Sequence, residues 1–282
     1  MSVRRVGVIG AGTMGNGIAQ VFTQAGFDVR LIDSAAPALD RARATIERSM
    51  ARFVEKGRMT AGDRDAALAR LSAGTSVDSV ADCDYIVEAV FEDAQVKRSL
   101  FARLDQITRP DVVLSSNTSS ISITLLGAAT NRAGKVLGMH FMNPVPVMSL
   151  VELIRGQATS AEAMMTATEL CIRLNKTAVE SADYPGFIAN RVLMPMINEA
   201  IFALMEGVGT AESIDTVMRL GMNHPMGPLT LADFIGLDVC LAILEVLHTG
   251  LGDPKYRPCP LLRRMVSAGH LGRKSGQGFY KY

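Results

Sequence analysis

The sequence predicts an α/β protein with a mostly parallel sheet and helices on both faces, followed by an all-helical C-terminal domain. Short runs rich in β-branched residues alternate with helical patterns as far as about residue 180, which is typical of a parallel sheet. Beyond residue 185 only helical periodicity continues. Because 48% of the 282 residues are hydrophobic and 20% are charged, the chain can bury cores of this kind.

The predicted strands are separated by segments long enough for crossover helices. In chain order they are residues 4–9, 28–32, 73–76, 84–88, 112–116, 135–140, 149–155 and 176–180. Residues 37–70 are too long and too charged for one crossover helix, so they predict a helical hairpin broken at Gly57. The sheet domain with this hairpin should occupy residues 1–183.

The helical domain is predicted to span residues 184–282, because a Pro-Gly pair follows Asp183 and Tyr184. Its first helix contains Pro195, which is expected to kink it. Pro228 suits the first position of a second helix, expected to run to about His248.

The first strand leads into a glycine-rich turn. The turn consists of Gly10, Ala11, Gly12, Thr13, Met14 and Gly15. In this pattern the glycines permit a tight turn, backbone approach to a pyrophosphate and close packing of the next helix. Asp33 ends the second strand, where a carboxylate binds a ribose hydroxyl and repels a 2′-phosphate. The alternative is a glycine-rich turn that binds no ligand. The combination of the strand, the following helix and Asp33 favours a Rossmann-type domain that binds NAD rather than NADP.

Polar side chains stand at the ends of later strands. Asn117 and Ser119 follow strand 112–116, and His140 ends the next strand. Glu152 is the one carboxylate in an apolar run, where a buried acid needs a partner that His140 could supply. A His–Glu pair suits oxidation of an alcohol, because imidazole can take the hydroxyl proton near neutrality. The alternatives are a core histidine satisfied by backbone groups and helix-capping roles for Asn117 and Ser119.

The helix predicted from residue 37 carries a basic face. Residues 40–58 hold six basic and three acidic side chains. Arg41, Arg48, Arg52 and Lys56 recur at helical spacing. This face is either simply solvated or a docking surface for a phosphorylated part of a substrate.

The bulk properties exclude several functional classes. A net charge of +1 gives no electrostatic case for nucleic acid or membrane partners, and no apolar run approaches the roughly 20 residues of a membrane span. The four cysteines have no metal-site spacing, so no metal is expected. They are most simply reduced thiols, and with no signal peptide expected we predict a cytoplasmic protein.

In this order the motifs resemble those of the 3-hydroxyacyl-CoA dehydrogenase family, and most closely its short bacterial 3-hydroxybutyryl-CoA dehydrogenase type. The matching segments cover essentially the whole chain: residues 10–15, 116–120, 140–148, 150–154, 185–191 and 272–280. The resemblance implies reversible NAD-dependent oxidation of a (3S)-3-hydroxyacyl-CoA to the 3-oxoacyl-CoA. A short acyl chain such as 3-hydroxybutyryl is expected, with 3-hydroxyadipyl-CoA as the alternative. Phe91 departs from many relatives and bears on acyl-chain preference.

The resemblance also implies a role for individual residues. His140 would be the base, Glu152 would orient it, and Ser119 and Asn190 would hydrogen-bond the substrate. Besides the glycine turn, the matching NAD contacts are Asp33, Glu92, Lys97, Asn117, Asn143 and Lys274. Ser49 and Lys56 match contacts to CoA, with Arg52 on the same face, and the helical domain is implied to form a homodimer.

Two other functions stay open from the sequence. Related dehydrogenases of free 3-hydroxy acids have a lysine four residues before the matching asparagine, where this chain has Gly186. A dinucleotide-binding protein without catalytic activity would not need Ser119, His140, Glu152 and Asn190 together.

Overall fold

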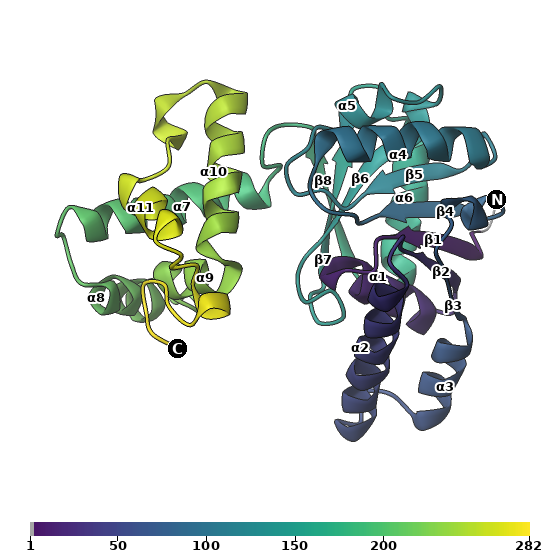
Figure 1. Ribbon diagram of the computed structural model, residues 1–282, viewed down its shortest axis with the longest axis horizontal. Helices are drawn as coiled ribbons and strands as arrows, with labels where there is room; N and C mark the ends of the chain where they lie inside the picture. The colour runs from purple at the N-terminus through teal and green to yellow at the C-terminus, as the bar shows by residue number, and fades with distance from the viewer. Residues whose placement is uncertain (1–2) are drawn as a thin grey trace. The chain divides into compact units, whose positions relative to one another are not determined.

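The computed structural model describes residues 3–282 and divides into two compact units, Met1–Asp183 and Tyr184–Tyr282. The first unit is built on a sheet and the second is helical, as the sequence predicted for the fold class (Figure 1). Within the described residues no helix combines the length and the apolar character that crossing a membrane requires.

The first unit contains an eight-stranded sheet in the order β3-β2-β1-β4-β5-β6-β7-β8. Its strands are β1 (Arg5–Ile9), β2 (Asp28–Ile32), β3 (Leu71–Gly74), β4 (Tyr85–Glu88), β5 (Val113–Ser116), β6 (Val136–Phe141), β7 (Leu150–Arg155) and β8 (Thr177–Ala182). Neighbours pair in parallel except β6 and β7, which are antiparallel. This is the doubly wound arrangement, in which ligands bind beyond the carboxyl ends of the parallel strands.

The third strand begins two residues earlier than predicted. Leu71–Gly74 pairs with β2, whereas Ser76 leaves the sheet to cap the short 3₁₀ helix Val77–Val80. Its hydroxyl accepts a hydrogen bond from the Asp78 amide at 3.3 Å. Ser76 therefore belongs to the cap and not to the strand, because a serine hydroxyl competes with the ladder for backbone amides.

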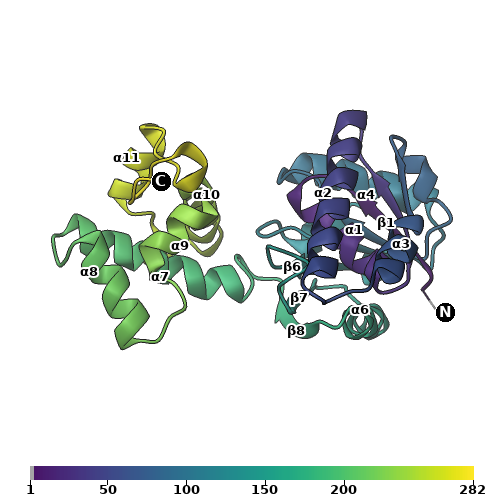
Figure 2. The ribbon, with the colours of Figure 1, turned by 90° about the horizontal axis from the view of Figure 1, so that it is seen from below.

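Helices cover both faces of this sheet. They are α1 (Thr13–Gln24), α2 (Ala36–Glu55), α3 (Ala61–Ala69), α4 (Ala94–Ile107), α5 (Ile123–Gly127) and α6 (Ala161–Arg173). Side chains of α1 and α6 share one apolar core with Tyr85 and Val87 of β4. Because side chains alternate along a strand, Ile86 faces the opposite side. On that side α4 packs against α5. Helix α6 packs against β6, β7 and β8, and Figure 2 shows it beside β8.

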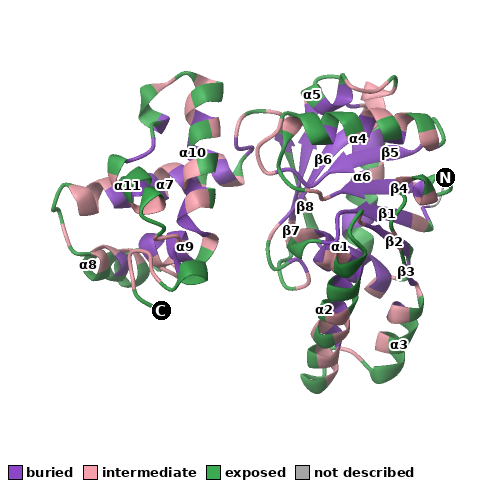
Figure 3. Cartoon of the chain, in the orientation of Figure 1, coloured by how far each residue is buried: buried purple, intermediate pink, exposed green. Residues whose placement is uncertain are grey.

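Helices α2 and α3 form the predicted hairpin beside the sheet (Figure 1). Gly57 separates them with φ of +65°, a left-handed conformation that glycine adopts without strain. Thr60 begins the second helix by accepting a hydrogen bond from the Asp63 amide. Figure 3 shows the buried strands beside the largely exposed outer faces of this hairpin.

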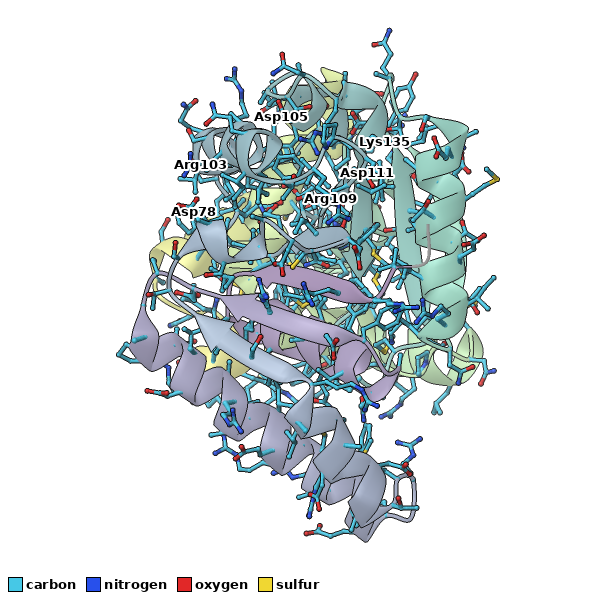
Figure 4. All side chains as sticks on the ribbon, turned by 90° about the vertical axis from the view of Figure 1, so that its right-hand side faces the viewer. Asp78, Arg103, Asp105, Arg109, Asp111 and Lys135 are labelled. Carbon is cyan, nitrogen blue, oxygen red and sulfur yellow. The ribbon has the colours of Figure 1, made fainter. Side chains whose placement is uncertain are left out.

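Several ion pairs lie on the outer surface of the first unit around α4 and the turn that follows it. Asp78 pairs with Arg103 at 2.7 Å, and Arg109 pairs with Asp84 at 2.9 Å and with Asp111 at 3.5 Å (Figure 4). Exposed pairs of this kind each contribute about 0–1 kcal/mol. Because this contribution is small, the stability of the sheet depends mainly on its buried core.

The second unit consists of five α-helices around its own core in the described chain. They are α7 (Ala189–Met205), α8 (Ala211–Thr216), α9 (Pro228–Ile235), α10 (Leu237–Leu251) and α11 (Pro260–Ser267). Helix α7 continues through Pro195. The single helix predicted from Pro228 to about His248 is wrong, because Gly236 has φ of +106° and separates α9 from α10.

The C-terminal tail is held by a buried carboxylate. Asp233 is 1% exposed and accepts hydrogen bonds from the amides of Phe279 and Tyr280 at 2.9 and 3.0 Å. A Cβ at Gly278 would lie 1.9 Å from an Asp233 oxygen. This part of the tail motif therefore needs glycine for docking onto the helical core.

Candidate active site

The glycine turn borders a cavity of about 730 Å³ at the carboxyl ends of β1 and β2. The turn itself is dictated by close backbone packing. Gly10 has φ of +104°, and a Cβ there would lie 2.4 Å from the Ala89 carbonyl oxygen. A Cβ at Gly15 would lie only 1.7 Å from the Gly10 oxygen. These two glycines are required by the chain's own geometry.

Gly12 differs, because a Cβ at this position would meet no protein atom within 4 Å. It precedes α1, whose N-terminus has no side-chain cap. The first amides of a helix lack internal partners and favour an anion. Open space above Gly12 and these amides together fit the pyrophosphate of a dinucleotide.

Asp33 lines the same cavity and is fixed by the backbone. One oxygen accepts from the Ala11 amide at 2.8 Å and the other from the Ala35 amide at 2.9 Å. The carboxylate is thus held at the edge of the cavity, where it can accept from ribose hydroxyls. Phe91 lines this cavity too, which associates it with the dinucleotide site.

His140 and Glu152 are brought together by strand register. The two residues lie opposite each other in the antiparallel pair of β6 and β7. His140 Nδ1 is 2.8 Å from Glu152 Oε2, and both side chains are buried. Because a carboxylate can only accept, Nδ1 carries the hydrogen, and Nε2 of the neutral ring is then an acceptor. Ser119 Oγ lies 3.2 Å from Nε2.

Asn117 connects the turn after β5 to the end of β6. Its Oδ1 accepts from the Phe141 amide at 2.9 Å, next to His140. The helix-capping alternative does not describe this side chain, since its partner belongs to another strand. Asn117 therefore keeps the strand ends that carry Ser119 and His140 in register.

A second cavity, of about 480 Å³, lies between α1, α2 and the turn after β6. Ser49 and Arg52 line it together with Asn143, which precedes the cis peptide bond to Pro144. Lys56, at the C-terminal end of α2, is not among the lining residues. Arg48, which the sequence placed on the same basic face, does line this cavity. The basic face thus borders a cavity in which a phosphorylated group could dock.

Glu92 and Lys97 form an ionic cluster with Glu88, a residue that the sequence analysis missed. Lys97 is 1% exposed, and its Nζ lies 2.6 Å from Glu88 and 3.3 Å from Glu92. Burial raises the pKa of Glu92, but Lys97 and hydrogen bonds from Thr118, Ser120 and Ser119 outweigh it and lower the pKa below its usual range. The sequence did contain a signal for Glu88, because this acidic residue stands at the end of a predicted strand.

Asn190 and Lys274 belong to the second unit. Asn190 is buried in the first turn of α7, and its amide donates to the Gly186 oxygen at 3.1 Å. Lys274 pairs with Asp238 at 2.6 Å. In the described chain no group of His, Cys, Asp or Glu is arranged to hold a metal, and the cysteines Cys83, Cys171, Cys240 and Cys259 are buried free thiols.

The glycine turn and the Ser119–His140–Glu152 arrangement define a Rossmann-type dinucleotide-dependent oxidoreductase. Residues 5–184 match the family model described as 3-hydroxyacyl-CoA dehydrogenase, NAD binding domain, and residues 186–282 match the C-terminal domain of the same family. The chain therefore belongs to the 3-hydroxyacyl-CoA dehydrogenase family, whose members are NAD-dependent oxidoreductases.

Similar proteins extend over the whole chain. A probable 3-hydroxybutyryl-CoA dehydrogenase of Deinococcus radiodurans is 58% identical, with 99% of this chain and 100% of the relative covered. The 3-hydroxybutyryl-CoA dehydrogenase of Bradyrhizobium diazoefficiens is 54% identical, with 99% and 96% covered. The crystal structure of (S)-3-hydroxybutyryl-CoA dehydrogenase from Ralstonia eutropha has a TM-score of 0.97 at 49% identity, with 100% and 99% covered.

Proposed function

We propose that this protein catalyses the reversible oxidation of (3S)-3-hydroxybutyryl-CoA, or a similar short-chain 3-hydroxyacyl-CoA, to the 3-oxoacyl-CoA. The single observation that carries the proposal is the line of contacts from Glu152 through His140 to Ser119. The family membership and the full-length similarity to 3-hydroxybutyryl-CoA dehydrogenases support the choice of substrate.

In this mechanism His140 is the general base. Its Nε2 takes the proton of the C3 hydroxyl while the C3–H bond breaks and the C3 oxygen becomes a carbonyl. Bound at the glycine turn, NAD would supply the acceptor for the hydride that leaves C3. The imidazolium that forms is stabilised by Glu152, which is 2% exposed and stays beside Nδ1. In the reverse direction the imidazolium returns the proton to the oxygen.

Ser119 and Asn190 are the proposed hydrogen-bonding partners of the substrate. Ser119 Oγ lies 3.2 Å from His140 Nε2, so a substrate hydroxyl that donates to Nε2 and accepts from Ser119 would be held at the reacting position. Asn190 would supply a second contact from the first turn of α7. For the CoA moiety, Ser49 and Arg52 line a suitable cavity. Lys56 lies on the same helix face outside the lining of this cavity and would add a positive charge near it.

The remaining proposed contacts are with NAD. The amides of the glycine turn would bind the pyrophosphate, and Asp33 the adenosine ribose. Glu92, Lys97, Asn117, Asn143 and Lys274 are proposed NAD contacts from the family resemblance alone. Because Lys97 is 1% exposed, a contact from this side chain would require it to move from its carboxylate partners.

The helical unit is the proposed substrate and dimerisation domain. Its first helices and the turn after them expose large apolar side chains, a feature typical of interaction surfaces. They include Val192, Val208, Val217, Leu220 and Met222. Light scattering should then give twice the chain mass of 30.2 kDa, and a monomer would contradict the homodimer. A cytoplasmic location stays a prediction of the sequence.

The test of the proposed function is NADH formation by the purified protein from 3-hydroxybutyryl-CoA and NAD. His140→Gln should keep NADH affinity but lose about 10²–10⁴-fold in kcat, the usual contribution of a general base. Near-normal turnover by this variant would refute the role of His140. His248→Gln, on α10 in the second unit, is the matched control and should keep full activity.

Longer acyl-CoA substrates, 3-hydroxyadipyl-CoA and free 3-hydroxybutyrate complete the assay. Higher kcat/KM with 3-hydroxyadipyl-CoA would transfer the assignment to that substrate. Activity with the free acid alone would indicate a hydroxy-acid dehydrogenase, and NAD binding without turnover of any substrate would indicate a protein that only binds the dinucleotide.

A further inference from the structure

The carboxylate of Glu92 joins two loops at the carboxyl edge of the sheet. Glu92 follows β4, and its Oε1 accepts from the turn after β5 that carries Ser119. The donors are Thr118 Oγ1 at 2.5 Å, the amides of Ser119 and Ser120 at 3.0 and 3.1 Å, and Ser120 Oγ at 3.0 Å. One oxygen therefore gathers the hydrogen-bond donors of three consecutive residues.

The other oxygen of Glu92 is held by Lys97. Lys97 Nζ lies 3.3 Å from Oε2 and is itself anchored by Glu88 at 2.6 Å and by the Val90 carbonyl at 3.3 Å. A buried ammonium retains its charge at low cost only beside such partners. The ammonium thus fixes the direction in which the Glu92 carboxylate points.

Glu88 connects this cluster back to the start of the same turn. Its Oε2 accepts from Ser116 Oγ at 2.6 Å, and Ser116 Oγ accepts from the Thr118 amide at 3.1 Å. The contacts close a ring from Glu88 through Lys97 and Glu92 to Thr118. Two carboxylates and one ammonium therefore clamp the turn at both its beginning and its end.

The clamped turn determines where the Ser119 hydroxyl lies relative to His140. Asn117 ties the near side of the turn to β6 through the Phe141 amide, and Glu92 ties the far side to the β4–α4 segment. Ser119 Oγ then lies 3.2 Å from His140 Nε2. A misplacement of about 1 Å at such a position can lower turnover by about 10²-fold.

We propose that Glu92, held by Lys97, is a positioning residue for Ser119. This role is additional to any contact that Glu92 makes with NAD. It rests on the proposed function, in which Ser119 binds the substrate oxygen. The effect on Ser119 passes through the backbone and hydroxyl contacts of residues 118–120, so it should be present whether or not cofactor is bound.

The experiment compares Glu92→Ala, Glu92→Gln and the matched control Asp93→Asn. Asp93 is the adjacent acid and caps α4 by accepting from the Val96 amide at 2.9 Å, a role that asparagine fills equally well. We expect Glu92→Ala to lose about 10²-fold in kcat at saturating NAD, beyond any loss of NADH affinity that comes from its proposed contact with the cofactor. Glu92→Gln, which keeps a neutral acceptor, should lose less, and Asp93→Asn should match the wild type.

A double-mutant cycle with Ser119→Ala tests whether the effect passes through Ser119. If it does, Glu92→Ala should lower kcat little further in the Ser119→Ala background. Fully additive losses would overturn the proposal, and so would a loss confined to NADH affinity, because that result assigns Glu92 to cofactor binding alone.

Amide hydrogen exchange of Ser119 and Ser120 gives a readout that does not depend on activity. Both amides should exchange faster in Glu92→Ala than in the wild type and in Asp93→Asn. Unchanged exchange would overturn the clamp even in an active enzyme. Conversely, faster exchange in a protein that does not oxidise 3-hydroxybutyryl-CoA would leave the clamp standing and refute the proposed function instead.

Discussion

The two parts of the site in the first unit are built in different ways. The glycine turn is made of backbone within six consecutive residues, and its geometry is set by Gly10 and Gly15. The Ser119–His140–Glu152 arrangement is made of side chains from three segments, and its geometry is set by strand register and by the contacts of Asn117 and Glu92. A change in the turn should therefore act on cofactor binding, and a change in the arrangement should act on turnover.

The largest effect is expected at Gly15, where alanine places a Cβ 1.7 Å from the Gly10 oxygen. Because neither backbone segment can yield without opening the turn, Gly15→Ala should abolish measurable NADH binding. Titration of NADH fluorescence measures this loss.

Gly12→Ala sharpens the same comparison, because its Cβ meets no protein atom. The variant should unfold at the wild-type temperature, yet it should bind NADH more weakly, since the methyl group occupies the space proposed for the pyrophosphate. Wild-type NADH affinity in Gly12→Ala would contradict this placement of the cofactor.

At the other part of the site, Glu152→Gln removes a charge while keeping the size of the side chain. We expect kcat to fall by about 10²-fold, within the range that a general base contributes, because the imidazolium loses its stabilising anion. NADH affinity should not change. Glu180→Gln is the control, since Glu180 lies on the neighbouring strand β8 and faces solvent, paired with Arg155. Equal kcat values for the two variants would show that the charge at Glu152 has no catalytic role.

The smallest effect is expected from Asp33→Asn. Asparagine keeps the size of the side chain but can accept from only one of the Ala11 and Ala35 amides, and the repulsion of a 2′-phosphate is lost. The ratio of kcat/KM with NADP to that with NAD should rise about tenfold, equivalent to about 1.4 kcal/mol. Ser34→Ala, a neutral change in the same cavity, should leave the ratio unchanged.

The elements that could be predicted from sequence are those with a local cause. The eight strands, the hairpin broken at Gly57 and the glycine turn each follow from periodicity or from a residue with special backbone freedom. The errors have local causes as well. The third strand was displaced by the Ser76 cap, and the helix starting at Pro228 was too long because Gly236 lies within an otherwise helical pattern.

The sequence by itself determined the fold class and the glycine turn, and it predicted that His140 pairs with an acid, because a lone carboxylate in an apolar strand needs a partner. Only the tertiary structure decided how the polar residues at the strand ends are joined. The antiparallel register sets Glu152 opposite His140, and the Glu88–Lys97–Glu92 cluster ties the turn carrying Ser119 to a different loop. Such contacts depend on which strand ends become neighbours in space, and hydrophobic periodicity along the chain carries no information about that.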